Sequence, residues 1–270
     1  MSGSGASSGV RDWKRAAEEL ISSGQYPAAE QHCRQWRSLA PQEAEAHCLS
    51  GILALEQRQV AAALGHLEQA VGLDPGLSRA WVQMARALSL LRRTAESLQA
   101  ANRGFALQPA DALSLDTLGV IYSRANQHQR AAGLFRQAAV VAPDNAGYQF
   151  NLASALKFLG DFEGAEAAYE SCLNAEPEYW KAYPPLSQLR KQTAERNHRA
   201  RYEAMLPRAQ SVDAQLQLRL ALAKECEDLG QAREAFQHLL AGKSAKRASL
   251  GYDSAEDAAL FASVPTFPRF

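Results

Sequence analysis

The spacing of the prolines is the feature that most constrains the fold of this chain. Five prolines stand at intervals of 34 residues, at Pro41, Pro75, Pro109, Pro143 and Pro177. Self-similarity at a fixed period of about 20–50 residues indicates a repeat architecture, in which each unit buries its apolar face only by stacking on its neighbours. A proline also pushes the residue before it out of helical geometry, so each of these prolines predicts a boundary between units.

When the 34-residue units are aligned on these prolines, several other equivalent positions also hold similar residues, and each such set is called a column here. One column holds only small residues, namely Ala17, Gly51, Ala85, Gly119 and Ala153. A second small column follows twelve residues later, at Ala29, Ala63, Ser97, Ala131 and Ala165. A third column is larger and mostly apolar, with Cys33, Leu67, Ala101, Phe135 and Tyr169, and a fourth reads Trp13, His47, Trp81, Leu115 and Gln149. Small residues are expected where two helices approach closely, so each unit is predicted to be a pair of antiparallel helices.

The fifth unit shows the expected pair most clearly. Its first helix is predicted from Ala146 to Leu159 and its second helix ends near Asn174. Gly160 and Asp161 form the turn between them, because glycine adopts a left-handed conformation beyond a helix end without strain. Gly24 and Gly230 are predicted to occupy similar turns.

These columns resemble the tetratricopeptide repeat, whose pattern is W-x-x-L-G-x-x-Y followed by A-x-x-x-F and P. The closest copy is the fourth unit, through Leu118, Gly119, Tyr122, Ala131, Phe135 and Pro143. The resemblance implies an all-α fold, a right-handed α-solenoid of stacked antiparallel helix pairs (the TPR superhelix) with about seven repeats.

The regularity of the repeats divides the chain into five segments. Residues 1–9 are predicted to be a flexible tail, 10–179 to form five regular TPR units, and 180–215 to form a degenerate repeat. In the degenerate repeat, Pro184 and Pro185 are expected in the first turn of a helix, and the polar stretch 191–201 is expected to be a solvated helix face or loop. A unit with TPR-like spacing is predicted again at 216–242. Residues 243–270 are predicted to be a cap or linker, with a short helix at 255–262.

Charge and composition exclude several classes of partner. Lysine plus arginine equals aspartate plus glutamate, at 29 each. A neutral chain lacks the basic excess that nucleic acids and anionic membranes attract, so we expect neither partner. The sequence has no apolar run of about 18 residues and no signal-peptide pattern at its start. The four cysteines have no C-x-x-C spacing and are expected to be free buried thiols, which favours a cytoplasmic location.

No arrangement of residues typical of catalysis stands out. His32-Cys33 and His47-Cys48 are adjacent pairs, and adjacent residues on a helix point in different directions, which argues against zinc. Gly242-Lys243-Ser244 resembles the end of a phosphate-binding loop, but it follows a helical pattern where a strand would be needed. We therefore expect no catalytic, cofactor-binding or metal-binding residue, and no enzyme activity.

In tetratricopeptide proteins the first helix of each pair lines a concave groove that binds partners. The residues expected to face the groove are Lys14, Ile52, Arg79, Val82, Arg86, Thr117, Val120, Arg124, Phe150, Asn151, Lys157 and Phe158. They combine apolar side chains with more basic than acidic groups. This combination predicts a protein or peptide partner with hydrophobic anchors and acidic character. The alternative is that the charges only keep the groove soluble.

The last third of the chain resembles a narrower family. The residues that carry this resemblance are Leu220-Ala221-Leu222-Ala223-Lys224, Asp228-Leu229-Gly230, Ala235-Phe236, Gly242, Lys246-Arg247 and Tyr252-Asp253. They are similar to the segment that joins the solenoid to the catalytic domain in bacterial TPR-containing sulfotransferases, most specifically over residues 215–255. Two functions are therefore carried forward: an interaction scaffold, and the substrate-recruiting, non-catalytic region of a sulfotransferase.

Overall fold

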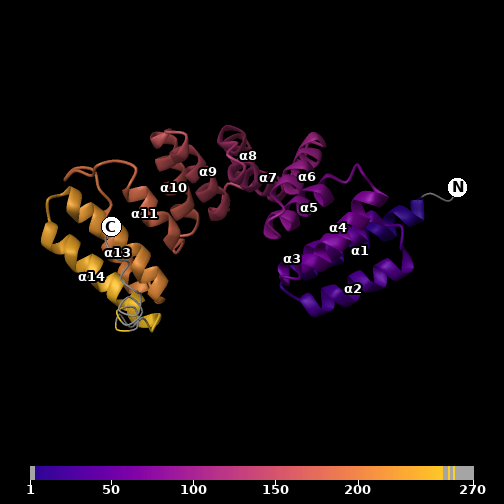
Figure 1. Ribbon diagram of the computed structural model, residues 1–270, viewed down its shortest axis with the longest axis horizontal. Coiled ribbons are helices and arrows are strands. Elements are labelled where there is room, and N and C mark those ends of the chain that lie inside the picture. The colour runs from indigo at the N-terminus through magenta and orange to yellow at the C-terminus, as the bar shows by residue number, and fades with distance from the viewer. Residues whose placement is uncertain (1–3, 252–254, 256–257, 259–270) are drawn as a thin grey trace, which may run out of the picture. The chain divides into compact units, whose positions relative to one another are not determined.

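The computed structural model describes residues 4–251, 255 and 258, and all its regular elements are helices within that part of the chain (Figure 1). The chain forms two compact units, Met1–Leu159 and Gly160–Phe270. The helices of the first unit are α1 (Ser4–Ser22), α2 (Tyr26–Leu39), α3 (Ala44–Glu56), α4 (Val60–Leu73), α5 (Ser78–Leu90), α6 (Thr94–Ala106), α7 (Ala112–Arg124), α8 (His128–Val141) and α9 (Ala146–Phe158). The predicted bounds of the helix at 146–159 are therefore confirmed to within one residue.

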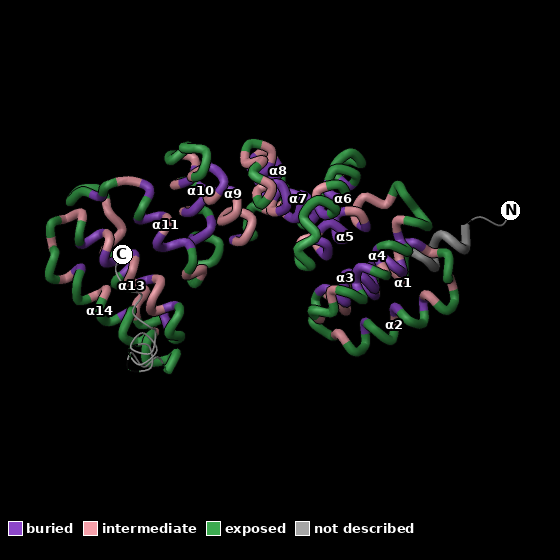
Figure 2. Tube along the Cα trace, in the orientation of Figure 1, coloured by how far each residue is buried: buried purple, intermediate pink, exposed green. Residues whose placement is uncertain are grey.

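The first helices of successive pairs form one packed row in this unit. Helix α3 contacts α1 and α5, and α7 contacts α5 and α9, while each second helix also contacts the first helix of the next pair. Helix α3 is consequently buried over nearly its whole length, at Ala44 and from Ala46 to Leu55 (Figure 2). This arrangement is the stacking that the 34-residue period predicted.

The small and large columns fit together by size. A Cβ atom placed on Gly51 would lie 2.5 Å from Leu67 Cγ, and one placed on Gly119 would lie 2.5 Å from Phe135 Cε1. In the third repeat both positions hold alanine, Ala85 and Ala101, and both are fully buried. At Gly51 and Gly119 the facing side chain therefore leaves no room for a Cβ atom, and the helices can approach there only because the residue is glycine.

The column that begins with Trp13 and continues through His47, Trp81, Leu115 and Gln149 has a hydrogen-bonding role that the sequence did not reveal. His47 Nε2, Trp81 Nε1 and Gln149 Nε2 each donate to the carbonyl of the proline six residues earlier, at 3.1, 2.9 and 3.0 Å. Tyr183 repeats the contact to Pro177 at 2.7 Å. Each contact provides a partner for a loop carbonyl that no helix can satisfy.

The fourth repeat lacks such a donor because the column holds Leu115. The connection into that repeat also has a different backbone. Helix α6 ends at Ala106, and Gln108 takes a positive φ of 53° before Pro109. Five other residues with positive φ lie between the two helices of a pair and follow the 34-residue register, namely Gly24, Arg58, Arg92, Asn126 and Gly160.

The beginning of the chain differs from its prediction. Helix α1 already begins at Ser4, inside the segment 1–9 expected to be a flexible tail. Once a helix has been nucleated, each further residue adds one backbone hydrogen bond, so the amphipathic helix that follows is able to extend toward the N-terminus.

The second unit departs from the regular repeat. Its elements are α10 (Phe162–Ala175), the 3-10 turn η1 (Trp180–Ala182), α11 (Tyr183–Ser187), α12 (Arg199–Met205), the 3-10 turn η2 (Leu206–Arg208), α13 (Val212–Asp228) and α14 (Ala232–Ser249). Pro184 and Pro185 lie in the first turn of α11, as predicted. Helix α11 is short, and the chain from 188 to 198 is not helical.

The end of the chain also differs from its expected boundaries. The predicted unit at 216–242 is the pair α13 and α14, but α14 continues to Ser249, into the segment expected to be a cap or linker. The helix predicted at 255–262 lies outside the described residues, apart from positions 255 and 258. In the part of the chain that the structure describes, no helix combines the length and apolarity needed to cross a membrane.

Candidate functional site

The cations predicted to line the groove are largely engaged within the protein. Lys14 on α1 pairs with Glu45 on α3 at 2.6 Å, and Arg86 on α5 pairs with Glu56 on α3 at 3.1 Å. Arg79 on α5 forms an ion pair with Glu18 on α1. Each pair joins the first helices of two repeats. An acidic partner could reach these cations only by competing with a carboxylate that is already in place.

The apolar candidates differ strongly in accessibility. Val82 has 0% exposure, because α6 approaches α5 closely at Gly104 and covers it. The prediction that Val82 is available to a partner is therefore wrong. Ile52 and Thr117 are also buried, although Ile52 lines a pocket with Leu49 and Arg79 on the first-helix side of the unit.

Asn151 is held by a neighbour in the row of first helices. Its Nδ2 donates to Asp116 Oδ1 on α7 at 2.8 Å. Burial raises the pKa of Asp116 above its ordinary value, and the hydrogen bond from Asn151 offsets only part of that effect. Phe150 and Lys157, on the same helix as Asn151, are half-buried.

Four of the predicted residues come together in one pocket of about 280 Å³. They are Val120 and Arg124 from α7 and Asn151 and Phe158 from α9, and we call this site the Phe158 pocket. Phe158 is 67% exposed, which is unusual for a large aromatic side chain on a first helix. The site is therefore an apolar surface with polar groups close to it, which suits recognition of a side chain.

His128 is a member of the Phe158 pocket that the sequence did not indicate. Its ring centroid lies 3.7 Å from that of Phe158. His128 begins α8, the second helix of its pair, and the prediction considered only first helices. The regular 34-residue register could have suggested it, because the first residue of each second helix lies close to the end of the first helix.

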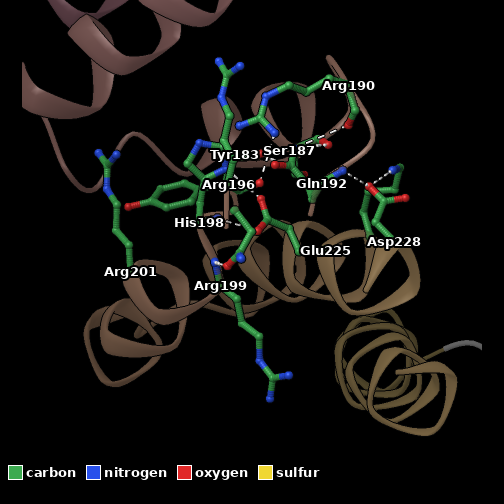
Figure 3. Close-up of polar contacts among 12 residues, drawn as sticks. Tyr183, Ser187, Arg190, Gln192, Arg196, His198, Arg199, Arg201, Glu225 and Asp228 are labelled. Atoms are coloured by element: carbon green, nitrogen blue, oxygen red, sulfur yellow. Dashed lines mark hydrogen bonds and ion pairs between the residues drawn. The ribbon is translucent and has the colours of Figure 1, made fainter. Parts of the chain in front are cut away.

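A second polar cluster lies in the second unit and surrounds the non-helical segment 188–198 (Figure 3). Glu225 on α13 has 0% exposure and accepts hydrogen bonds from the backbone N–H of His198 at 2.6 Å and from His198 Nδ1 at 2.7 Å. His198 Nε2 lies 3.5 Å from Glu170 Oε1, so both ring nitrogens face carboxylates. The polar stretch predicted to be solvated is therefore anchored to a buried acid.

Two further carboxylates hold the same segment. Arg190 and Arg196 bind Glu166 at 3.2 and 2.7 Å. Burial alone would raise the pKa of Glu166, but the two arginines outweigh it and hold that pKa below its ordinary value. Asp228 accepts from the backbone N–H of Gln192 at 2.9 Å. These groups satisfy one another, which is the arrangement of a structural network.

The prediction that the four cysteines are free buried thiols is confirmed. Burial raises the pKa of the Cys48 thiol to about 12, which leaves it protonated and unreactive at neutral pH. Within the described part of the chain, no group of three or more His, Cys, Asp or Glu side chains is arranged to hold a metal ion.

Several residues that carry the sulfotransferase resemblance have packing roles in the second unit. A Cβ atom on Gly242 would lie 3.3 Å from Arg219 Cβ, so Gly242 allows α13 and α14 to approach closely. Gly230 takes a positive φ of 77° in the turn between the two helices. The string Gly242-Lys243-Ser244 lies inside α14, in agreement with the interpretation that it is not a nucleotide-binding loop.

Comparisons with known proteins agree with the repeat register. Tetratricopeptide-repeat family models match residues 114–147 and 146–179, and the second match begins at Ala146, where the first helix of the fifth unit was predicted to begin. A search of curated proteins finds no significant match.

Solved structures provide the comparison for the whole fold. The chain resembles the Pseudomonas aeruginosa pilF protein at 14% identity with a TM-score of 0.58, over 84% of this chain and 96% of that one. It resembles PilW, a type IV pilus biogenesis factor, at 14% identity with a TM-score of 0.55, over 93% and 97% of the two chains. It resembles YrrB, described as a TPR protein with an unusual peptide-binding site, at 12% identity with a TM-score of 0.52, over 76% and 96%.

At such identities the likeness shows the fold alone. The fold is an all-α solenoid of tetratricopeptide type, and the chain contains tetratricopeptide repeats. These findings give no support to the resemblance of residues 215–255 to sulfotransferases, which stays a prediction.

Proposed function

We propose that this protein is a scaffold that binds a segment of a partner protein along its row of first helices, with the Phe158 pocket as the main anchor site. The observation that carries the proposal is the exposure of Phe158 beside Val120 and His128. Leaving a large aromatic ring in water forgoes burial worth about 2 kcal/mol. A partner side chain that covers the ring would recover that free energy on binding.

Two further points support this function. The row of first helices presents a long surface on which an extended or helical segment can lie, which is the usual mode of recognition by repeat proteins. The structural neighbour YrrB is described as having a peptide-binding site. The proposal applies that type of partner to this chain, with its own anchor residue.

A library of random dodecapeptides displayed on phage tests the proposal. We expect the full chain to select peptides with an aromatic or aliphatic residue, and Phe158→Ala to weaken their binding at least about tenfold, because anchor residues contribute 1.4 kcal/mol or more. Phe236→Ala is the matched control, since Phe236 is 64% exposed but lies on α14 in the second unit. Fluorescence anisotropy with labelled copies of the selected peptides measures the affinities. Equal losses in the two variants, or no selected peptide, would contradict the proposal.

The alternative function is the substrate-recruiting, non-catalytic region of a TPR-containing sulfotransferase. The run of residues between Leu220 and Asp253 favours it, although the structure gives several of them packing roles. The gene sequence downstream of the Phe270 codon tests this alternative. A phosphate-binding loop in the same reading frame would support it, and a stop codon or an unrelated domain would contradict it.

A further inference from the structure

A second pocket adjoins the Phe158 pocket in the first unit. It has a volume of about 660 Å³ and lies between the end of α5, the start of α6 and the end of α7. The polar side chains that line it are those of Ser89, Arg92, Thr94, Ser97 and Arg124. We call it the Arg92 pocket. Arg124 lines both pockets, so one bound segment can occupy the two sites together.

The Arg92 pocket has cations but no acidic lining residue. Among the described residues, no carboxylate forms an ion pair with either arginine, and Arg124 donates only to Ser89 Oγ, at 2.9 Å. Lys14, Arg79 and Arg86 differ, because each already has a carboxylate partner. Arg92 and Arg124 therefore keep their charge available to a ligand, in contrast to Lys14, Arg79 and Arg86.

The backbone adds to the preference of the pocket for an anion. Arg92 occupies the left-handed turn before α6, at φ 62°, and Thr94 is the first residue of that helix. No side chain caps this helix start, so its first N–H groups lack partners and carry partial positive charge. Glu96 lies in the same turn, but Arg93 holds it with contacts of 2.6 and 2.7 Å.

We propose that the Arg92 pocket binds a carboxylate of the partner segment through the guanidinium groups of Arg92 and Arg124. Guanidinium groups form charge-assisted, often bidentate hydrogen bonds with carboxylates, and here no internal carboxylate has to be displaced. The occupant is a segment of another protein in which an aspartate or glutamate lies close in sequence to the apolar residue that fills the Phe158 pocket. This inference rests on the proposed function and adds the acidic residue to it.

Two glycine variants make a matched test. Arg92→Gly removes the guanidinium and suits the positive φ at that position, so it preserves the fold. Arg58→Gly makes the same change at φ 60°, in the corresponding turn of the preceding repeat, outside the Arg92 pocket. Any loss specific to Arg92→Gly therefore reports the side chain and not the turn.

The experiment uses the random dodecapeptides selected by the full chain. We expect aspartate or glutamate to be enriched near the apolar anchor, and Arg92→Gly to weaken binding at least tenfold while Arg58→Gly leaves it unchanged. Replacing the acidic residue of the peptide by its amide should abolish that difference and the salt dependence of binding. Apolar enrichment without acidic enrichment, or equal affinities of the two glycine variants, would overturn this inference but leave the proposed function intact. Failure to select any peptide would overturn both.

A second copy of this chain is the competing occupant. Size-exclusion chromatography over a range of protein concentrations tests it. We expect the elution volume to stay constant. Self-association that Arg92→Gly abolishes would show that the pocket binds another copy, which would overturn the assignment to a partner protein.

Discussion

Replacing Glu225 by alanine is expected to lower the free energy of unfolding by about 3 kcal/mol. Glu225 is fully buried and accepts from both the backbone N–H and the Nδ1 of His198. Its removal leaves two donors without a partner in a region from which water is excluded, and the segment 188–198 loses its anchor on α13. The effect is large because a buried group that loses its only partner retains the full cost of desolvation.

Denaturant unfolding followed by circular dichroism measures this change, and amide hydrogen exchange locates it. Exchange should accelerate first in the segment 188–198 and in α12. Glu227→Ala is the matched control, because Glu227 is on the same helix but exposed, and its replacement should change stability by less than about 0.5 kcal/mol. Similar losses of stability for the two variants would show that the contact between Glu225 and His198 contributes little.

Replacing Gly119 by alanine is expected to destabilise the protein by about 2 kcal/mol. The new Cβ would lie 2.5 Å from Phe135 Cε1, and Phe135 is buried in the contact between α7 and α8. The ring or the helix must shift to relieve that clash. Gly133→Ala on α8 is the control, because nothing lies within 4 Å of its Cβ position. Alanine at position 133 should stabilise the helix by about 0.5–1 kcal/mol.

A double-mutant cycle tests the cause of the Gly119 effect. Phe135→Ala alone should cost about 3–5 kcal/mol through the cavity it leaves. The pair Gly119→Ala with Phe135→Ala should be less destabilising than the sum of the two single variants by about 2 kcal/mol, because the clash disappears with the ring. The combination reproduces Ala85 and Ala101 of the third repeat. Thermal unfolding of the four proteins gives the coupling, and additive effects would contradict the steric explanation.

The repeat register could be predicted from the sequence because its causes are local. A turn with positive φ, small residues at the helix crossing and a proline after the second helix recur in every regular unit, so they occupy equivalent positions in the aligned units. The positions of Gly119 and Phe135 already imply that the two residues face each other within one hairpin. The Phe158 pocket could be predicted in part for the same reason, since Val120, Arg124, Asn151 and Phe158 all lie on first helices.

The accessibility of the groove residues could not be predicted in the same way. Val82 has the register of a groove residue, yet Gly104 of the second helix allows a close approach that covers it. Arg79 and Arg86 appeared to be free cations, but their partners Glu18 and Glu56 lie on other repeats. Ion pairs between different repeats depend on how the repeats stack, and the 34-residue periodicity of the sequence does not indicate them.

The sequence by itself determined the all-α repeat fold, the helix pairs of its regular part and the position of the irregular sixth unit. Periodicity of 34 residues suffices for this, because each hairpin is specified within its own unit. Only the tertiary structure decided that the segment 188–198 is bound to the buried Glu225, and that Arg92 and Arg124 line a pocket that adjoins the Phe158 pocket. Burial and ion pairing are set by residues far apart in the chain, which come together only when the helices are stacked.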